Sequence, residues 1–440
     1  MTSDRSQRSS AERSSLGAHA PDEHARVGSR PAHHATEHRR KVVDMRDSLR
    51  FTRIREGLVA LAAVGAMTLL AACGGAGSGS SAPQGAAADS ASVEEAKSLV
   101  AQAQQQVAWP QPGPPAFDAS SARGKTLGWV AITASNPFSQ IMLEGAREAA
   151  ALSGLNIDYC DGKGRPSEWV RCADSLIAKG VDALLIQSID PKILSASIEA
   201  ATRAGIPVIE TSSNDSSQPP TPGVSAANNF AIAEMGKLLA DYAIADSNGR
   251  VNAVYYGAPE VALSPPLHQA IEAEFRRLCP DTCTLKSSDV PVGEWDTRLP
   301  TVVQSGISAD RDINYLIPLA DGAVPAMIPA VHAANATERV KILSITASPS
   351  IVKFIDSGDV FVADVGPSTE WHGWSTVDQA LRLIVGQPKG SPILHDPQMP
   401  IRLFDKANVG ELNFDDPKMA NFFGPVDLAA EYGRVWGITP

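Results

Sequence analysis

The sequence predicts an α/β protein with two doubly wound lobes, each a parallel β-sheet with helices on both faces. Two observations predict this fold. From residue 123 onward, short apolar runs alternate with runs of helical periodicity, joined by loops of about two to six residues. Such alternation favours right-handed crossovers and parallel strands. After residue 211 the same pattern starts again, which indicates a second, similar lobe.

The individual elements follow from their local patterns. Run 125–132 is apolar and rich in β-formers, which is typical of a buried strand. Run 138–152 has helical periodicity and ends at Gly154, a helix-terminating residue. By the same criteria the predicted strands are 125–132, 155–159, 183–187, 208–211, 250–256, 285–288, 315–319 and 341–345. The predicted helices are 138–152, 167–179, 191–204, 232–245, 267–278, 297–306 and 323–334.

Length and composition limit the functional classes. At about 150 residues per domain, 440 residues suggest roughly three domains. Apolar residues make up 43% and charged residues 20%, as in chains that bury a core. The net charge of −11 argues against nucleic acid as a partner, because phosphate binding needs a basic face. The first 72 residues differ from the rest, with 12 basic and 8 acidic residues.

The N-terminal region predicts export rather than folding. Residues 1–44 are polar and are expected to be disordered, or to be an untranslated extension upstream of a true start at Met45. Residues 45–72 have a basic flank and a 14-residue apolar run. As a helix that run spans about 21 Å, less than the roughly 30 Å of a bilayer core, so it predicts an export signal.

The end of this signal resembles a bacterial lipoprotein signal, because Leu70-Ala71-Ala72 precedes Cys73. The resemblance implies cleavage before Cys73 and lipidation of that residue. A short membrane anchor that stays attached is the alternative. Both place the chain outside the cytoplasm, anchored to the outer face of the cytoplasmic membrane. Residues 73–122 are rich in Ala, Gly, Ser, Gln and Pro and are expected to form a flexible tether, with a short helix between 93 and 107 as an option.

The remaining chain resembles the ribose-type, type I periplasmic solute-binding proteins of ABC importers. Five stretches carry the resemblance, which covers about residues 125–390. They are Ser135-Asn136-Pro137-Phe138 after the first strand, 178–186 followed by 204–209, and Ser357-Gly358 and 383–388 near the end. It implies three crossings between the lobes, near Ala226, Gly366 and Pro392. Lobe I is then expected to be 123–226 plus 367–392, and lobe II 227–366 plus 393–440.

Ligands of open α/β sheets bind beyond the carboxyl ends of the strands. Matched to the family, those ends imply a cleft with fewer charged groups than a sugar site usually has, because Ser212, Ser213 and Thr346 stand where charged residues are expected. Trp371 is added because it follows a loop that leads toward the cleft. The expected ligand-binding residues are Asn136, Phe138, Ser139, Gln187, Ser212, Ser213, His268, Asp321, Thr346 and Trp371.

Four cysteines beyond Cys73 form two close pairs, Cys160 with Cys172 and Cys279 with Cys283. An exported chain permits disulfides, and these spacings allow them. Zinc is the alternative, although neither pair has a nearby His.

No motif of an acyl-transfer elbow, a phosphate-binding loop or a zinc protease occurs, so no catalytic residue, cofactor or resident metal is expected. The sequence therefore predicts a monomeric, lipid-anchored solute-binding protein that delivers a small molecule, a sugar or sugar-like compound, to an ABC permease. A sensor subunit that presents a ligand to a membrane receptor is the alternative, and a secreted hydrolase is a further one.

Overall fold

The computed structural model describes residues 89–109, 116–386, 399–416 and 418–438. They belong to one compact unit that extends from Gly79 to Pro440. The predictions for the polar extension, the export signal and Cys73, and for the crossing near Pro392, lie outside the described residues.

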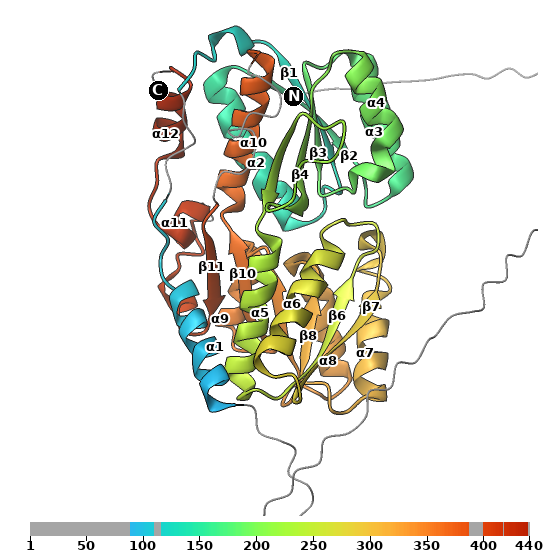
Figure 1. The fold of residues 1–440 in the computed structure, drawn as a ribbon, viewed down its shortest axis with the longest axis vertical. Coiled ribbons are helices and arrows are strands. Elements are labelled where there is room, and N and C mark those ends of the chain that lie inside the picture. Colours follow the sequence, from blue (N-terminus) through green and yellow to red (C-terminus); the bar gives the residue numbers. More distant parts are fainter. Residues whose placement is uncertain (1–88, 110–115, 387–398, 417, 439–440) are drawn as a thin grey trace, which may run out of the picture. The chain divides into compact units, whose positions relative to one another are not determined.

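The first lobe is built on a parallel five-stranded sheet in the order β2-β1-β3-β4-β5. Helices α3 and α4 pack together beside this sheet, and α2 and α10 pack against each other on its other side (Figure 1). The strands are β1 (Thr126–Ala131), β2 (Asn156–Asp161), β3 (Ala183–Gln187), β4 (Val208–Asp215) and β5 (Ala226–Phe230). The helices are α2 (Pro137–Ser153), α3 (Pro166–Lys179), α4 (Ser195–Arg203) and α10 (Thr369–Ile384).

The second lobe has a six-stranded sheet in the order β11-β10-β9-β8-β6-β7. Its neighbouring strands are parallel except for β11, which pairs antiparallel with β10 at one edge. The strands are β6 (Val251–Gly257), β7 (Cys283–Asp289), β8 (Tyr315–Pro318), β9 (Lys341–Ile345), β10 (Phe361–Pro367) and β11 (Ile401–Asp405). The helices are α5 (Ile232–Ser247), α6 (Ser264–Leu278), α7 (Leu299–Ala309), α8 (Val324–Ala333) and α9 (Pro349–Asp356).

These sheets confirm the predicted fold class of two α/β lobes and replace the estimate of three domains. The antiparallel β11 departs from the expected wholly parallel sheet. In the described residues the chain passes from the first sheet to the second between β5 and α5, and returns between β10 and α10.

An additional helix, α1 (Ser90–Ala103), lies in the segment expected to be a flexible tether. Val93, Ala96 and Val100 are spaced by three and four residues and form one buried stripe. This stripe packs against α5 and also reaches β11. The prediction of a tether is therefore wrong for this segment, because its apolar positions lie on one helical face that the second lobe covers.

The segments on either side of residues 110–115 pair with the C-terminal region of the chain. The amide of Val107 donates to Phe423 O (3.1 Å), and the amide of Phe117 donates to Val435 O (2.8 Å). The last helix, α12 (Leu428–Val435), packs against α2 and α10 of the first lobe, and the short α11 (Met419–Phe423) contacts α10. The assignment of residues 393–440 to the second lobe is thus wrong for α12. We call the described residues 104–109, 116–122, 406–416 and 418–438 the paired terminal segments.

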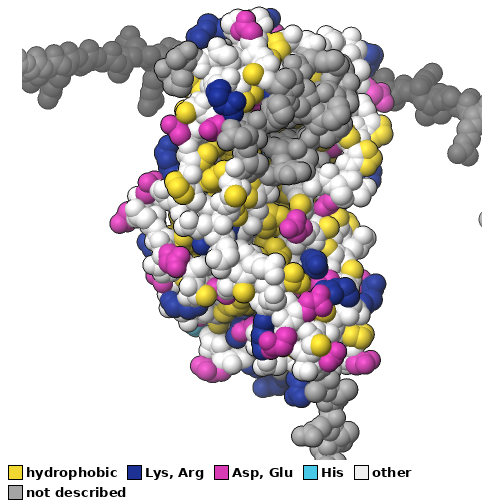
Figure 2. All heavy atoms as spheres, turned by 60° about the vertical axis from the view of Figure 1, so that its left-hand side comes forward, with side chains coloured by type: hydrophobic (Ala, Val, Ile, Leu, Met, Phe, Trp, Pro, Cys, Tyr) yellow, Lys and Arg dark blue, Asp and Glu magenta, His cyan; other side chains and the backbone are white. Residues whose placement is uncertain are grey.

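Figure 2 looks onto the side of the molecule that carries these terminal elements. Hydrophobic side chains gather around the middle of this face, and basic and acidic side chains lie next to one another over its lower half. Elsewhere in the described residues, ion pairs form within single helices, such as that of Arg276 with Glu272 on α6.

Two acidic residues between α5 and α6, Asp241 and Glu274, predict an unusual pH dependence of the free energy of unfolding. Asp241 on α5 is fully buried beside Glu274 on α6, and burial, followed by the charge of Glu274, raises the pKa of Asp241 to about 8. The unfolded chain loses this proton near pH 4 while the folded chain keeps it, so stability falls as pH rises from about 4 to 8. Asp241→Asn should flatten this slope and stabilise the protein at pH 8 by on the order of 1 kcal/mol or more. Urea unfolding at pH 5, 6.5 and 8 measures the slope, and an unchanged slope would contradict the assignment.

Candidate functional site

A pocket lies between the two lobes, where the carboxyl ends of both sheets face each other. Its lining comes from residues on or just after β1, β3, β4 and β5 of the first lobe and β6, β7, β8 and β9 of the second. The empty space within it, including open solvent, is about 590 Å³. This position at the strand ends is where open α/β sheets bind ligands.

Three hydroxyl-bearing residues of the pocket have a left-handed backbone, which side chains with a Cβ adopt rarely. Ser188 has φ 58°, Ser212 has φ 50° and Thr346 has φ 100°. Each costs of order 1–3 kcal/mol, and such residues cluster at binding sites. This backbone conformation changes the direction of the chain at the strand ends, where the three residues line the space between the lobes.

Two of these hydroxyls are buried, one in each lobe. Ser212 is fully buried and its Oγ has no hydrogen-bond partner among the described residues, whereas Thr346 is 6% exposed and its hydroxyl faces the carboxyl group of Asp321. Because an unpaired buried hydroxyl costs about 1–3 kcal/mol, Ser212 is a ready contact for a polar group between the lobes. The Thr346 hydroxyl, which has two acceptor lone pairs, can still accept from such a group.

Asn136 is a further polar group of the lining, at the N-terminus of α2. Its Oδ1 accepts from Ser139 N (2.7 Å) and caps the helix. This bond orients the side chain, and no hydrogen bond within the described residues uses its amide nitrogen, which can therefore donate to a ligand.

The ionisable residue of the pocket lining is Asp321, which lies after β8 and is fully buried. Its Oδ2 accepts from Ser348 N (2.7 Å), and Asp364 Oδ1 on β10 accepts from Ala347 N (3.1 Å). Burial raises the pKa of Asp321, and burial together with the charge of Asp321 raises the pKa of Asp364 well above its usual range. The two carboxyl groups are coupled, and burial of both disfavours two negative charges at this place.

Apolar side chains form most of the pocket surface. Phe138 and Phe230 of the first lobe meet edge to face with ring centroids 5.6 Å apart. The second lobe contributes Trp295, whose indole nitrogen donates to Val290 O (3.1 Å) and thereby fixes the ring. Further apolar lining residues are Ile132, Val261, Leu263, Val292, Leu319, Ala320 and Ile345.

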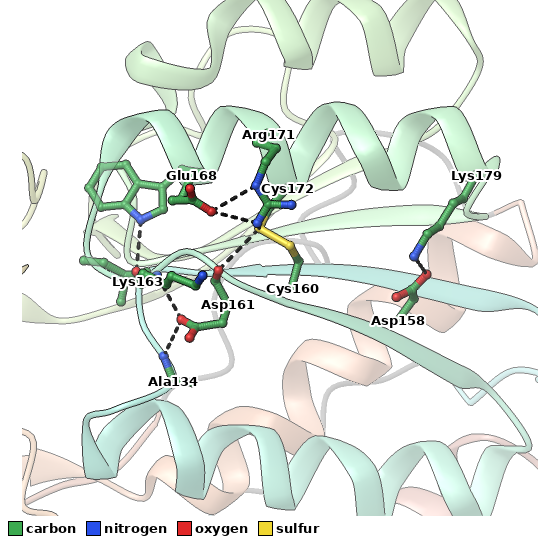
Figure 3. The surroundings of a disulfide bond; sticks show 11 residues. Ala134, Asp158, Cys160, Asp161, Lys163, Glu168, Arg171, Cys172 and Lys179 are labelled. Atoms are coloured by element: carbon green, nitrogen blue, oxygen red, sulfur yellow. Dashed lines mark hydrogen bonds and ion pairs between the residues drawn. A yellow bond between two sulfur atoms is a disulfide. The ribbon is translucent and has the colours of Figure 1, made fainter. Parts of the chain in front are cut away.

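One loop of the first lobe is fixed by a disulfide and an aspartate, as Figure 3 shows. The Cys160–Cys172 bond joins the end of β2 to α3, with Cα atoms 5.6 Å apart. Asp161 Oδ1 accepts from Ala134 N and from Lys163 N, both at 2.9 Å. The loop that follows β2 is thereby held at three points.

The tip of this loop touches the second lobe beside the pocket. A methyl group placed on Gly164 would lie 3.0 Å from Gly293 N, and one on Gly322 would lie 3.4 Å from Asn136 Cβ. The two lobes therefore meet at two backbone positions next to the pocket, where side chains would hold them apart.

The second predicted disulfide, Cys279–Cys283, joins the end of α6 to β7 with Cα atoms 5.4 Å apart. In the structure both cysteine pairs are disulfides, so they are not zinc ligands. Among the described residues no group of three or more His, Cys, Asp and Glu side chains could hold a metal ion.

Half of the predicted ligand-binding residues line the pocket. These are Asn136, Phe138, Ser212, Asp321 and Thr346. All five lie on or directly after a strand or at the start of the following helix, as the strand-end rule requires. Their contact with a ligand stays a prediction.

The structure does not bring the other five predicted residues to the pocket lining. Gln187 is fully buried between Trp129 Nε1, from which it accepts (2.8 Å), and Ser139 Oγ, to which it donates (3.0 Å). This bond occupies Ser139 as well, so both residues have partners within the core of the first lobe. Ser213 Oγ, also buried, donates to Thr211 O (3.0 Å).

His268 and Trp371 also lie outside the pocket lining. His268 on α6 packs against Tyr255, with ring centroids 5.3 Å apart. Trp371 on α10 is buried and meets Trp109 of the terminal segment edge-on at 5.6 Å. Packing with residues distant in the sequence directs both side chains elsewhere.

Sequence reasoning missed much of the apolar lining. Val261, Leu263 and Val292 lie in loops, where an isolated apolar residue carries no periodic signal. Phe230 ends β5, a strand with two asparagines that was not predicted. The usable signal was the presence of apolar residues directly after predicted strands, at positions where loops are normally polar.

The fold and the pocket define a two-lobed solute-binding protein. Residues 127–388 match the family model described as periplasmic binding protein domain, and the chain belongs to this family. Its proteins are extracytoplasmic solute-binding proteins rather than enzymes. Among the described residues no helix is both long and apolar enough to span a bilayer.

Three comparisons illustrate the similarity. The ABC transporter periplasmic-binding protein YphF of Escherichia coli (strain K12) is 21% identical over 304 residues, which is 67% of this chain and 90% of that protein. A carbohydrate transporter from Acidothermus cellulolyticus 11B in complex with myo-inositol has a TM-score of 0.57 at 18% identity, over 68% of this chain and 98% of that one. An ABC transporter solute-binding protein from Mycobacterium smegmatis with bound glycerol has a TM-score of 0.56 at 20% identity, over 66% and 96%.

Proposed function

We propose that this protein is a membrane-anchored lipoprotein that captures a sugar or sugar-like solute between its lobes and delivers it to an ABC importer. The observation that carries the proposal is the pair of buried pocket hydroxyls, Ser212 Oγ and Thr346 Oγ1, one from each lobe. A solute that bonds to both is held best when the lobes are together, so binding shifts the population toward the closed state. A permease can then distinguish loaded from empty protein.

The similar structures with bound myo-inositol and glycerol support a polyhydroxyl solute. The sequence Leu-Ala-Ala before Cys73 supports a lipid anchor at that residue. An anchored protein stays at the membrane that holds the permease, which raises its effective concentration there.

Uptake measurements in the native host test the proposal. Deleting the gene should abolish uptake of the solute that the purified protein binds, and the wild-type gene should restore it. Cys73→Ala should bind the solute with unchanged affinity but move from the membrane fraction to the soluble fraction, with reduced uptake. Normal uptake in the deletion strain would contradict the importer role and favour a sensor subunit.

A further inference from the structure

We propose that the interlobe pocket selects an uncharged solute with a hydrogen-bonding end and an apolar end, such as a deoxygenated, alkylated or aryl-substituted sugar or cyclitol. This inference rests on the proposed function, because it names the solute class of the same site. Three properties of the pocket support this inference: its charge, the distribution of its polar groups and its apolar surface.

The pocket offers no partner to an anionic solute. Its lining among the described residues includes no Lys, Arg or His. The ionisable residue, Asp321, is an acid that is buried beside Asp364. A phosphate or carboxylate would therefore lose its hydration and gain no salt bridge.

The carboxyl pair is also poorly placed to hold a cation. Backbone amides of Ser348 and Ala347 already donate to the two carboxyl groups, and burial disfavours the charged forms that would attract a cation. The remaining polar groups of the lining, on Asn136, Ser188, Ser212 and Thr346, are neutral. Neutral amide and hydroxyl groups suit the hydroxyls of an uncharged solute.

In the second lobe the polar groups lie at one end of the pocket. Asp321 follows β8 and Thr346 follows β9, the strand beside β10, through which the chain returns to the first lobe. The first lobe offers polar groups along the pocket, from Asn136 after β1 to Ser212 on β4, with Phe230 at the end of β5. The separation of polar from apolar groups therefore lies in the second lobe, where the hydrogen-bonding end of the solute faces the ends of β8 and β9.

The opposite end of the pocket is apolar. Val261 and Leu263 follow β6, and Val292 and Trp295 follow β7, the outermost strand of the second sheet. These side chains project from loops at the edge farthest from the crossings. They offer a surface for an apolar substituent of the solute. A fully hydroxylated sugar ring on this surface would leave hydroxyl groups without hydrogen-bond partners.

Calorimetric titration of the purified protein with matched pairs of compounds tests the inference. The pairs are D-galactose with D-fucose, myo-inositol with a mono-O-methyl-inositol, and methyl with phenyl β-D-glucoside. Glucose 6-phosphate and glucosamine serve as the charged probes. We expect the more apolar member to bind about fourfold tighter for a single methyl group, and more for phenyl, with no measurable binding of the charged probes.

Variants locate the effect at the apolar end. Trp295→Ala should reduce the ratio of affinities within each pair toward one, whereas Thr346→Ala should weaken both members equally. Val292→Asn provides a second test of the apolar end if Trp295→Ala does not fold. Phe354→Ala, at an exposed position on α9, is the control and should change neither quantity.

The outcomes separate the two proposals. Tighter binding of the more hydroxylated member, or of a charged probe, would overturn the solute class while leaving a binding protein in place. If no compound of either kind binds and deletion of the gene leaves uptake intact, the proposed function itself fails.

Discussion

Gly373→Ala is expected to destabilise the first lobe by about 3 kcal/mol or more, or to prevent folding. Gly373 lies on α10 where this helix crosses α2, and a methyl group there would lie 2.2 Å from Met142 O. The reciprocal position has the same restriction, since a methyl group on Gly145 would lie 2.3 Å from Glu370 O. Because the obstacle is backbone, no rotamer change can relieve it, and the helices must separate. Urea unfolding followed by circular dichroism measures the loss.

Gly410→Ala is the matched control for this prediction. A methyl group at Gly410 meets no atom within 4 Å, and this glycine has no left-handed backbone. Its substitution should change stability by less than about 0.5 kcal/mol. Equal effects of the two substitutions would contradict the close helix crossing.

Arg382→Met should cost about 3–5 kcal/mol, because it leaves a buried carboxylate without its cation. Arg382 Nε donates to Asp378 Oδ2 (2.8 Å) within α10, and its side chain is 1% exposed. Asp378 Oδ1 also accepts from Trp436 Nε1 (2.8 Å), just beyond α12. The guanidinium lies 4.4 Å from the ring centroid of Phe117, so the substitution also loosens the terminal segment. Thermal and urea unfolding measure the loss.

Arg276→Met tests whether burial of the ion pair is the reason for the loss of stability expected in Arg382→Met. Arg276 forms an ion pair with Glu272 at the same helical spacing, but its side chain is 67% exposed. Exposed pairs contribute about 0–1 kcal/mol, so this substitution should have little effect. The double variant Asp378→Asn with Arg382→Met should recover part of the stability, because it removes the unpaired charge. A similar loss at both arginines would refute this explanation.

The alternation of strands and helices could be predicted because each of those elements carries its signal locally. The helix α10 was not predicted, because its buried face includes polar residues whose partners lie in distant parts of the chain. His372 Nε2 hydrogen-bonds with Thr211 Oγ1 and Asn228 O, both at 2.8 Å, and burial lowers the pKa of this histidine to about 3. Nearly all side chains of this helix are buried, so it has no polar outer face that would give an amphipathic pattern.

The candidate site could be predicted where position along a strand was sufficient. Ser212, Asp321 and Thr346 lie where strand ends place them, whatever their chemistry. The role of Gln187 could not be predicted, because it depends on Trp129 and Ser139, which other elements bring to it. The sequence also suggested a cleft with few charges, which the lining has, but gave no measure of its apolar surface.

The paired terminal segments affect how far the lobes can swing apart. Helix α1 packs on the second lobe and α12 on the first, and the hydrogen bonds of Val107 and Phe117 join the two ends of the chain between them. In the proposed capture of a solute, opening must be absorbed by these segments as well as by the crossings, and we expect a stiffer hinge with a smaller amplitude. A narrower range of open conformations lowers the free-energy cost of closure, so a modest set of contacts with the solute can be sufficient for capture.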